Sequence, residues 1–271
     1  MPPDCFIVPG VRLRRACLLG WPFGLRFCVL LCVLMPVYNE SRLLPKVIER
    51  FDAVPPPLGL ERRLVIVDDG SSDSTPEVVR RLSSRADVVA RLHERNRGKG
   101  AAVRTAWRAA LEAGADIVLI HDADLEYDPA DHADVLLPIM DGRADAVIGT
   151  RFLGATHRVL YYWHSVANRF ITTASNMLTN LNLTDIECCT KALTRRAAER
   201  ITLEEDRFGL EPEIVAKLAR LRLAGPDGVE HPARVYEVPV SYSGRTYAEG
   251  KKITWRDGVS ALRCILKYGM R

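Results

Sequence analysis

The stretch Ile117–Asp124, IVLIHDAD, runs four large apolar residues directly into two carboxylates that are one residue apart. Such an uninterrupted apolar run is typical of a strand that is buried on both faces, as in a parallel sheet covered by helices. Three further runs have the same character and also lead into polar residues: Phe27–Met35, Leu64–Val67 and Ala144–Ile148. The sequence therefore predicts four strands of one buried sheet.

Helical patterns lie between these strands. Ser74 and Pro76 provide a cap and a first-turn proline for one helix. Residues 100–112 predict another helix, which stops at Gly114. This alternation indicates a doubly wound α/β domain over about 27–150, with a mostly parallel, Rossmann-like sheet and helices on both faces.

The second half of the chain has a different pattern. It predicts a helix over 160–183, another over 211–223, a strand over 234–240, a basic loop over 241–252 and an amphipathic helix over 257–268. None of these segments has the length and apolarity of a membrane span.

Residues 1–26 are expected to be an N-terminal extension. Arg14, Arg15 and the apolar residues after them resemble a signal peptide or a membrane anchor. However, Arg26 interrupts the apolar run, and the remaining Phe27–Met35 is shorter than the roughly 20 residues that a bilayer span needs. A buried first strand explains this segment better.

Composition excludes several classes of protein. Hydrophobic residues make up 48% and charged residues 27%, and the mean hydropathy is −0.03, which excludes wholesale disorder and a polytopic membrane protein. A net charge of +4 is too small to imply a nucleic-acid partner, but it allows a basic pocket for phosphates or contact with an anionic membrane. Seven cysteines without a CxxC pair indicate reduced structural thiols rather than a disulfide framework.

Polar side chains follow the ends of the predicted strands. They are Tyr38, Asn39 and Glu40, then Asp68 and Asp69, then Asp122 and Asp124, then Arg151. Because open α/β sheets bind ligands at the carboxyl ends of their strands, these side chains together predict one site. An Asp-Gly pair such as the one at Asp69 would by itself indicate only a turn.

Asp122 and Asp124 are the sharpest of these signals. Alternate residues of an extended segment point to one side, so the two carboxylates can converge on Mg²⁺ or Mn²⁺, which in turn grips a diphosphate. Glu126 continues the alternation and could complete the metal shell. Asn96–Gly100, NRGKG, precedes a predicted helix and either binds an anion or is only a glycine-rich helix entry.

Four of these segments stand in the order seen in family 2 inverting glycosyltransferases, which have the GT-A fold: Pro36–Glu40, Val67–Asp73, Asn96–Gly100 and Asp122–Asp124. The chain most resembles the dolichyl- or polyprenyl-phosphate sugar synthases, also through Gly149–Phe152, Asn180–Asp185 and Gly244–Lys252. The resemblance covers about 31–260. It implies transfer of a sugar, with inversion, from a UDP- or GDP-linked donor.

The resemblance also implies roles for single residues. The nucleotide sugar would contact Pro36, Tyr38, Glu40, Asp69, Lys99, Asp122 and Arg245. The metal would be held by Asp122, Asp124 and Glu126, although the family's dolichyl mannose enzymes commonly have glutamine where Glu126 stands. The donor would bind to the half 27–150, and the acceptor to 151–271 of the same domain.

A polyprenyl phosphate acceptor is already anionic, so it needs cations that position it rather than a strong general base. Arg151 is the first candidate, followed by Arg158 and Arg169, whose alternatives are a surface arginine and a helix arginine in an ion pair. Asp185 and Glu187 would contact the sugar, or act as base toward a hydroxyl acceptor. Alternatively, these carboxylates pair with Lys191.

Three other features have structural interpretations. We expect His121 to be a buried core histidine and Glu213 to be favoured by the helix dipole alone. The aromatic stretch Tyr161–Trp163 is expected to pack or to face lipid.

The predicted function is a metal-dependent glycosyltransferase that acts on a polyprenyl phosphate. It is expected at the cytoplasmic membrane face, bound peripherally or through a membrane partner subunit, because no pair of transmembrane segments follows the domain. Transfer to a glycan or protein hydroxyl, and a nucleotide-sugar-binding module without turnover, remain as alternatives. A nucleotidyltransferase is less consistent with the sequence, because no glycine-rich GxGxR loop follows the first strand.

Overall fold

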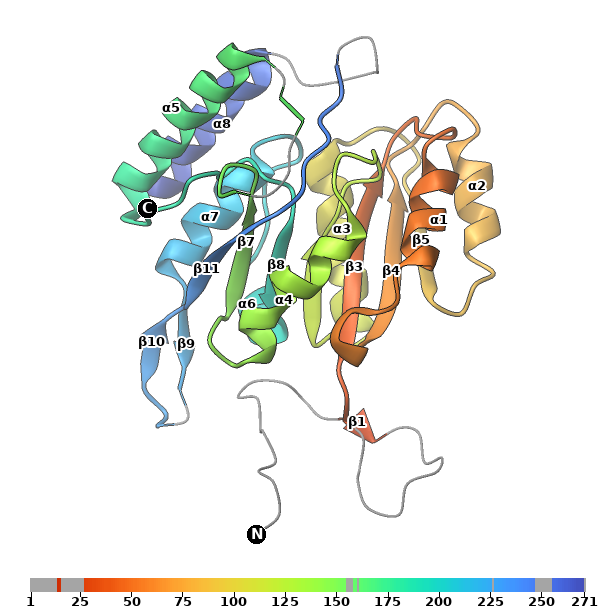
Figure 1. Cartoon of the computed structure of the whole chain (residues 1–271), viewed down its shortest axis with the longest axis horizontal. Coiled ribbons are helices and arrows are strands. Elements are labelled where there is room, and N and C mark those ends of the chain that lie inside the picture. The colour runs from red at the N-terminus through yellow and green to blue at the C-terminus, as the bar shows by residue number, and fades with distance from the viewer. Residues whose placement is uncertain are drawn as a thin grey trace.

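The computed structural model describes residues 14–15, 27–154, 158–159, 161–225, 227–246 and 255–270. Its centre is a seven-stranded sheet in the order β11-β7-β8-β6-β3-β4-β5 (Figure 1). The strands are β3 (Leu30–Val37), β4 (Glu61–Asp68), β5 (Val88–Leu92), β6 (Ile117–Ile120), β7 (Ala146–Thr150), β8 (Lys191–Thr194) and β11 (Val235–Pro239). All neighbours are parallel except β8, which is antiparallel to both β6 and β7. The predicted α/β class is confirmed.

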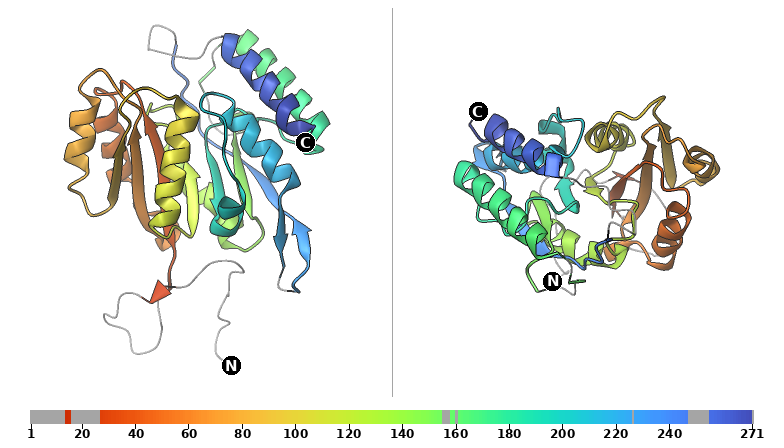
Figure 2. Two further views of the ribbon diagram at one scale, coloured as in Figure 1. Left: turned by 180° about the vertical axis from the view of Figure 1, so that it is seen from behind. Right: turned by 90° about the horizontal axis from the view of Figure 1, so that it is seen from above.

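Helices cover both faces of the sheet, with α3 (Lys99–Glu112) and α4 (His132–Met140) on opposite sides (Figures 1 and 2). The apolar runs are buried as predicted wherever their side chains are described from Leu30 onward, and the residues Leu31–Met35 of β3 are 0% exposed. The remaining helical segments are α1 (Leu44–Ala53), η1 (Pro57–Gly59), α2 (Thr75–Leu82), η2 (Pro129–Asp131), α5 (Tyr162–Thr179), α6 (Arg195–Arg200), α7 (Leu210–Arg220) and α8 (Trp255–Gly269).

Several short elements were not predicted. The strand β8 has only four residues and begins with a lysine, so it carries no alternating or continuous apolar pattern. Helix α7 ends at Arg220, before the predicted end, and an antiparallel hairpin of β9 (Arg222–Ala224) and β10 (Glu230–Pro232) follows it. Near the N-terminus, β1 (Arg14–Arg15) pairs antiparallel with β2 (Phe27–Cys28).

Ser74 is the N-cap residue of α2 as predicted, but its side chain makes no cap hydrogen bond. Instead the Asp73 carboxylate accepts from the backbone N–H of Thr75 (3.0 Å) and from its hydroxyl (2.6 Å). An ionised carboxylate is the stronger acceptor for the orphan donors of a helix N-terminus.

Close packing at the start of α3 requires glycines there. Gly98 has φ +101°, and a Cβ added at Gly100 would lie 2.2 Å from the carbonyl oxygen of Glu205. The chain around Glu205 therefore passes directly over the helix entry, which only glycine permits. This close approach brings Lys99 and the residues before α7 into one neighbourhood.

Two further findings concern the described residues. No helix among them is long and apolar enough to cross a bilayer. Cys32, Cys188, Cys189 and Cys264 are buried free thiols, as the cysteine pattern predicts.

Candidate active site

A cavity of about 430 Å³ lies at the carboxyl ends of β3, β4, β6 and β7. Within the described part of the chain it brings together most of the predicted site residues. They are Pro36, Tyr38, Glu40, Asp69, Lys99, Asp122, Asp124, Glu126, Arg151, Glu187 and Arg245. The polar strand ends therefore converge as the topology predicts.

The loops after β3 and β4 are tied together at the cavity. Asn39 adopts the left-handed conformation, with φ +51°. Its backbone N–H donates to Ser71 Oγ (2.8 Å), and its side-chain oxygen accepts from the N–H of Ser72 (2.8 Å). The two motifs thus form one rim, which fixes the positions of Tyr38 and Asp69.

Asp69 organises the loop before α3. Its buried carboxylate accepts from the backbone N–H groups of Arg97 (3.0 Å) and Gly98 (2.7 Å), and it lies 2.6 Å from His93 Nδ1. Both carboxylate oxygens therefore have partners within the protein. The side chain shapes the rim where Lys99 begins its helix.

Lys99 bridges two halves of the sequence. Its ammonium lies 2.8 Å from Asp122 Oδ2 and 2.9 Å from Glu211 Oε1. Burial opposes the charge of Lys99, but these carboxylates raise its pKa well above the usual value. Although burial also opposes ionisation of Asp122, the Lys99 ammonium lowers the pKa of that carboxyl. Asp122 is thus an ionised partner of Lys99.

Asp124 lies in a crowded group of carboxylates. Burial, followed by the charges of Asp122 and Glu126, raises the pKa of Asp124 to about 7. Arg245 opposes this repulsion, with its guanidinium 3.0 Å from Asp124, 3.3 Å from Glu126 and 3.5 Å from Glu40. The site therefore stabilises positive charge beside Asp124.

The predicted three-carboxylate shell is not assembled. No group of three His, Cys, Asp or Glu side chains among the described residues is arranged to hold a metal ion. Asp122 is bound to Lys99, and Glu126 accepts from Tyr242 Oη (2.9 Å) and from the backbone N–H of Arg245 (2.9 Å). Asp124 is nevertheless a hard oxygen donor that a divalent cation would suit, because Mg²⁺ often takes one or two carboxylates plus phosphates and water.

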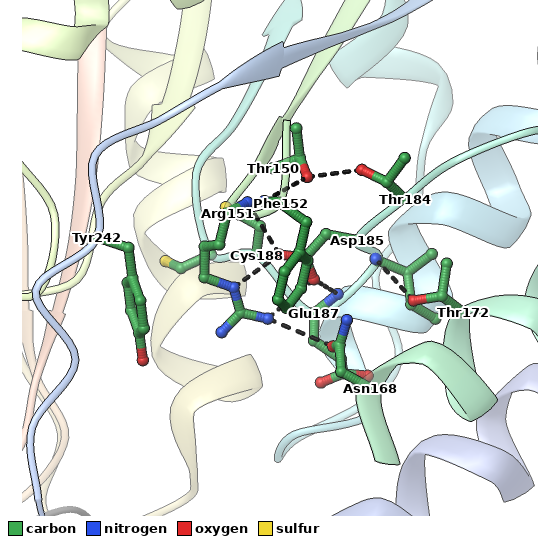
Figure 3. A network of polar contacts seen from close by, with 12 residues as sticks. Thr150, Arg151, Phe152, Asn168, Thr172, Thr184, Asp185, Glu187, Cys188 and Tyr242 are labelled. Carbon is green, nitrogen blue, oxygen red and sulfur yellow. Dashed lines mark hydrogen bonds and ion pairs between the residues drawn. The ribbon is translucent and has the colours of Figure 1, made fainter. Parts of the chain in front are cut away.

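The Arg151 guanidinium forms an ion pair with the buried carboxylate of Asp185 (Figure 3). Its Nε lies 2.6 Å from Asp185 Oδ2 and its Nη2 lies 2.8 Å from Asp185 Oδ1. Asp185 is 0% exposed, whereas Arg151 lines the cavity. The alternative pairing with Lys191 is wrong for Asp185, since Lys191 Nζ donates to the carbonyls of Ile186 and Cys188.

Glu187 is a buried carboxyl that favours its neutral form. Burial and then the charge of Glu211 raise the pKa of Glu187 to about 8. Glu187 Oε1 and Glu211 Oε2 are buried and have no hydrogen-bond partner within the described structure, and both residues line the cavity. The pair thus offers a donor and an acceptor to a bound hydroxyl-rich group.

Two predicted arginines lie elsewhere. Arg158 and Arg169 are both exposed, and neither is among the described residues that line the cavity. Arg158 Nη1 donates to the carbonyl of Gly244 (3.3 Å), so it contacts the loop that carries Arg245. The predicted segment 247–252 lies outside the described residues.

The structural interpretations have mixed outcomes. His121 is buried and lies 3.0 Å from His132, so its prediction as a core histidine is confirmed. Glu213 does more than stabilise a helix dipole, because it accepts from the N–H groups of Glu204 (2.7 Å) and Glu205 (2.9 Å). The stretch Tyr161–Trp163 is exposed rather than packed.

Sequence reasoning missed several residues that line the cavity. These are Tyr127, Cys189, Arg207, Phe208, Glu211 and Tyr242. For Glu211 one signal existed, since an acidic residue at the start of an apolar helix can face a ligand as well as the helix dipole. The others carry no motif and are brought to the cavity only by the fold.

A model of Glycosyl transferase family 2 matches residues 32–202 of the chain. Among curated proteins, Glycosyltransferase AglJ of Haloferax volcanii is 33% identical over 189 residues, which are 70% of this chain and 58% of AglJ. An undecaprenyl-phosphate 4-deoxy-4-formamido-L-arabinose transferase of Proteus mirabilis is 26% identical over 221 residues, covering 81% of this chain and 61% of that protein. The chain therefore spans less than two thirds of either relative.

A third relative is covered more fully. The UDP-N-acetylglucosamine–dolichyl-phosphate N-acetylglucosaminyltransferase of Methanococcus voltae is 26% identical over 212 residues, covering 72% of this chain and 82% of that protein.

Solved structures of glucosyl-3-phosphoglycerate synthase from Mycobacterium tuberculosis share the fold. A complex with Mn²⁺, UDP and phosphoglyceric acid has a TM-score of 0.63 at 19% identity, over 89% of this chain and 78% of that one. A complex with Mg²⁺ and UDP has a TM-score of 0.62 at 20% identity, over 89% and 79%. The predicted GT-A fold is confirmed.

Proposed function

The chain belongs to glycosyl transferase family 2, and on that premise we propose that it transfers a sugar, with inversion, from a nucleoside-diphosphate donor to a polyprenyl phosphate. The observation that carries the proposal is that one cavity is lined both by carboxylates after β3 and β6 and by Arg151, which is ion-paired with the buried Asp185. In the sheet, β8 separates β7, which precedes Arg151, from β6. Relatives named for undecaprenyl and dolichyl phosphate support the acceptor class.

We assign donor binding to the half 27–150. Pro36, Tyr38 and Glu40 line the rim where the nucleoside would lie, and Asp69 supports that rim. Next to this rim the ion pair of Lys99 and Asp122 lines the cavity. Glu211, from the half 151–271, forms the second ion pair of Lys99.

We propose Asp124 as the direct ligand of a divalent cation, with Asp122 and Glu126 beside it. The cation, when bound, would neutralise charge on the departing nucleoside diphosphate. In the structure the Arg245 guanidinium is ion-paired with Asp124 and Glu126. When a cation neutralises these carboxylates instead, the guanidinium can bind the diphosphate. The Mn²⁺ and Mg²⁺ complexes of the fold relative support this assignment.

Arg151 would hold the acceptor phosphate. An oxygen of that phosphate attacks the anomeric carbon, and the bond from that carbon to the nucleoside diphosphate breaks on the opposite face. No proton has to be abstracted, because the nucleophile is already ionised. The buried Asp185 is then a positioning residue for Arg151 rather than a base.

Glu187 and Glu211 would recognise the donor sugar. A protonated Glu187 can donate a hydrogen bond to a sugar hydroxyl, and the Glu211 oxygen that lacks a partner in the described structure can accept one. Buried polar groups of this kind favour the substrate that satisfies them.

The proposed acceptor requires contact with a membrane. We therefore propose that the protein works peripherally at the cytoplasmic membrane face, or together with a membrane partner subunit.

The test is a screen of UDP- and GDP-linked sugars with a polyprenyl phosphate, in the presence of Mg²⁺ or Mn²⁺, that follows the lipid-linked product. We expect product from one donor class and none after chelation of the metal. Donor hydrolysis without lipid product would contradict the acceptor, and donor binding without any turnover would indicate a binding module.

A further inference from the structure

One side of helix α5 contacts residues of the candidate active site. The side-chain oxygen of Asn168 accepts from Arg151 Nη2 (3.3 Å), and Thr172 Oγ1 accepts from the backbone N–H of Ile186 (3.4 Å), in the loop that carries Asp185 (Figure 3). This helix therefore supports the proposed acceptor residues directly. A helix with its side chains is about 10 Å thick, so its outer face is only that far from Arg151.

The outer face of α5 is apolar. Trp163, Val166, Phe170 and Met177 are exposed, the tryptophan to 75%, the phenylalanine to 64% and the methionine to 81%. Their spacing of three, four and seven residues places them along one side of the helix, opposite the buried Asn168. Single exposed apolar residues are ordinary, but an aligned row of four is not.

Helix α8 widens this surface. It packs beside α5 (Figure 2), and Gly269 permits the contact, since an added Cβ would lie 2.9 Å from Leu178 Cβ. Its own exposed apolar residues are Val259 and Leu266, again on one side of the helix, and the exposed Met270 directly follows its end. The α5–α8 apolar face is defined here as the exposed side chains of Trp163, Val166, Phe170, Met177, Val259, Leu266 and Met270.

The charges around this face match an anionic lipid surface. The 18 residues of α5 include no Asp or Glu, and among the described side chains of the two helices the exposed cations are Arg169 on α5 and Arg263 on α8. Tryptophan and tyrosine prefer the headgroup level of a bilayer, and arginines next to an apolar helix face are attracted to anionic lipids. Two copies of this face would instead bring like charges together.

We propose that the α5–α8 apolar face lies in the headgroup region of an anionic bilayer and so brings the Arg151 side of the cavity next to a membrane-bound phosphate. This inference rests on the proposed lipid acceptor, and it identifies the surface that reaches it. Trp163 and Phe170 are the expected anchors, because aromatic side chains bury the most apolar area.

The first experiment measures binding to vesicles of equal parts phosphatidylcholine and phosphatidylglycerol, without any acceptor or donor. The wild-type chain should sediment with the vesicles, and Trp163→Ser/Phe170→Ser should lower its partition coefficient at least about tenfold. The matched control is Leu58→Ser/Leu137→Ser, which removes two exposed leucines at other places and should bind like wild type. Equal binding of all three proteins, or no binding by wild type, would overturn the proposal.

The second experiment separates this inference from the proposed function. With a short-chain, water-soluble prenyl phosphate, the Trp163→Ser/Phe170→Ser variant should transfer sugar within about twofold of wild type. With a long-chain polyprenyl phosphate in vesicles it should lose at least about tenfold. If wild type uses neither acceptor, the proposed function fails, while the vesicle measurement still decides whether the face binds membranes. A wild-type dimer that this variant converts to monomer, without vesicle binding, would make the face a protein interface and overturn the proposal.

Discussion

Carboxylates in the cavity differ in charge because they differ in partners. Asp122 is partly buried, with a side chain that is 20% exposed, and the Lys99 ammonium at 2.8 Å lowers its pKa. Asp124 is two residues away, and there burial and repulsion raise the pKa to about 7. Glu187 faces Glu211 without a directly bonded cation, and its pKa rises to about 8. Asp122 is therefore suited to holding Lys99, Asp124 to binding a cation, and Glu187 to donating a hydrogen bond.

Asp124→Asn tests the cation site. The change keeps the shape of the side chain and removes its negative charge. We expect metal-stimulated donor binding and turnover to fall about a hundredfold or more, as on removal of a main electrostatic contributor. Calorimetric donor titrations with and without Mn²⁺, together with initial rates, measure both effects. Asp134→Asn on the exposed surface of α4 is the control, and near-normal transfer by Asp124→Asn would exclude this residue as the ligand.

Arg151→Lys tests the acceptor site while keeping a positive charge opposite Asp185. Lysine cannot reproduce the two parallel contacts of the guanidinium, so we expect a higher acceptor KM and a kcat lower by about tenfold or more, with donor affinity nearly unchanged. Arg108→Ala, on the exposed surface of α3 and outside the cavity lining, should stay within about twofold. An unchanged acceptor KM and kcat in Arg151→Lys would remove the phosphate-acceptor argument.

Glu187→Gln distinguishes a hydrogen-bond donor from a base. Because the pKa of Glu187 is about 8, the carboxyl is mostly protonated at pH 7, and glutamine preserves a neutral donor. We expect the variant to keep most of its activity at pH 7. Above pH 8 the wild type should lose activity as Glu187 ionises beside Glu211, whereas the variant should show no such decline. A loss of orders of magnitude at pH 7 would identify Glu187 as a base and favour a hydroxyl acceptor.

At the scale of elements, two buried histidines connect the end of β6 to α4. His121 Nδ1 and His132 Nε2 are 3.0 Å apart, and the Phe51 ring packs against both. Burial lowers the pKa of His121 to about 4, and that of His132 lies well below its usual value because of burial and of His121. Both are therefore neutral in the folded protein at pH 7.

This pair predicts acid sensitivity. Unfolded histidines take up protons near pH 6.5, and the folded pair does so only at much lower pH, so the free energy of unfolding falls as pH drops from about 6.5 toward 4. For His121 alone the loss at pH 5 is about 2 kcal/mol. Urea unfolding at several pH values measures it, and His132→Gln should flatten the dependence. A stability that is constant between pH 7 and 5 would contradict this account.

At the scale of the whole molecule, the first half of the site could be predicted because each motif directly follows a strand. Parallel strands bring their carboxyl ends to one edge, so the order of Tyr38, Asp69 and Asp122 in the sequence was enough. Glu211 could not be placed, since its contact with Lys99 depends on where α7 packs after the chain has crossed the sheet. Arg245 was predicted only through the family resemblance, because its carboxylate partners are far away in the sequence.

The antiparallel strand β8 has a consequence for synthesis. It lies between β6 and β7, although it follows both of them in the chain. Until Lys191–Thr194 has left the ribosome, β7 has no neighbour that joins it to β6, and the edge of β6 stays open. The half 27–150 therefore cannot complete its place in the sheet before the later half is made, as an independent domain would. During that interval the unpaired edge of β6 is exposed to pairing with a strand of another chain.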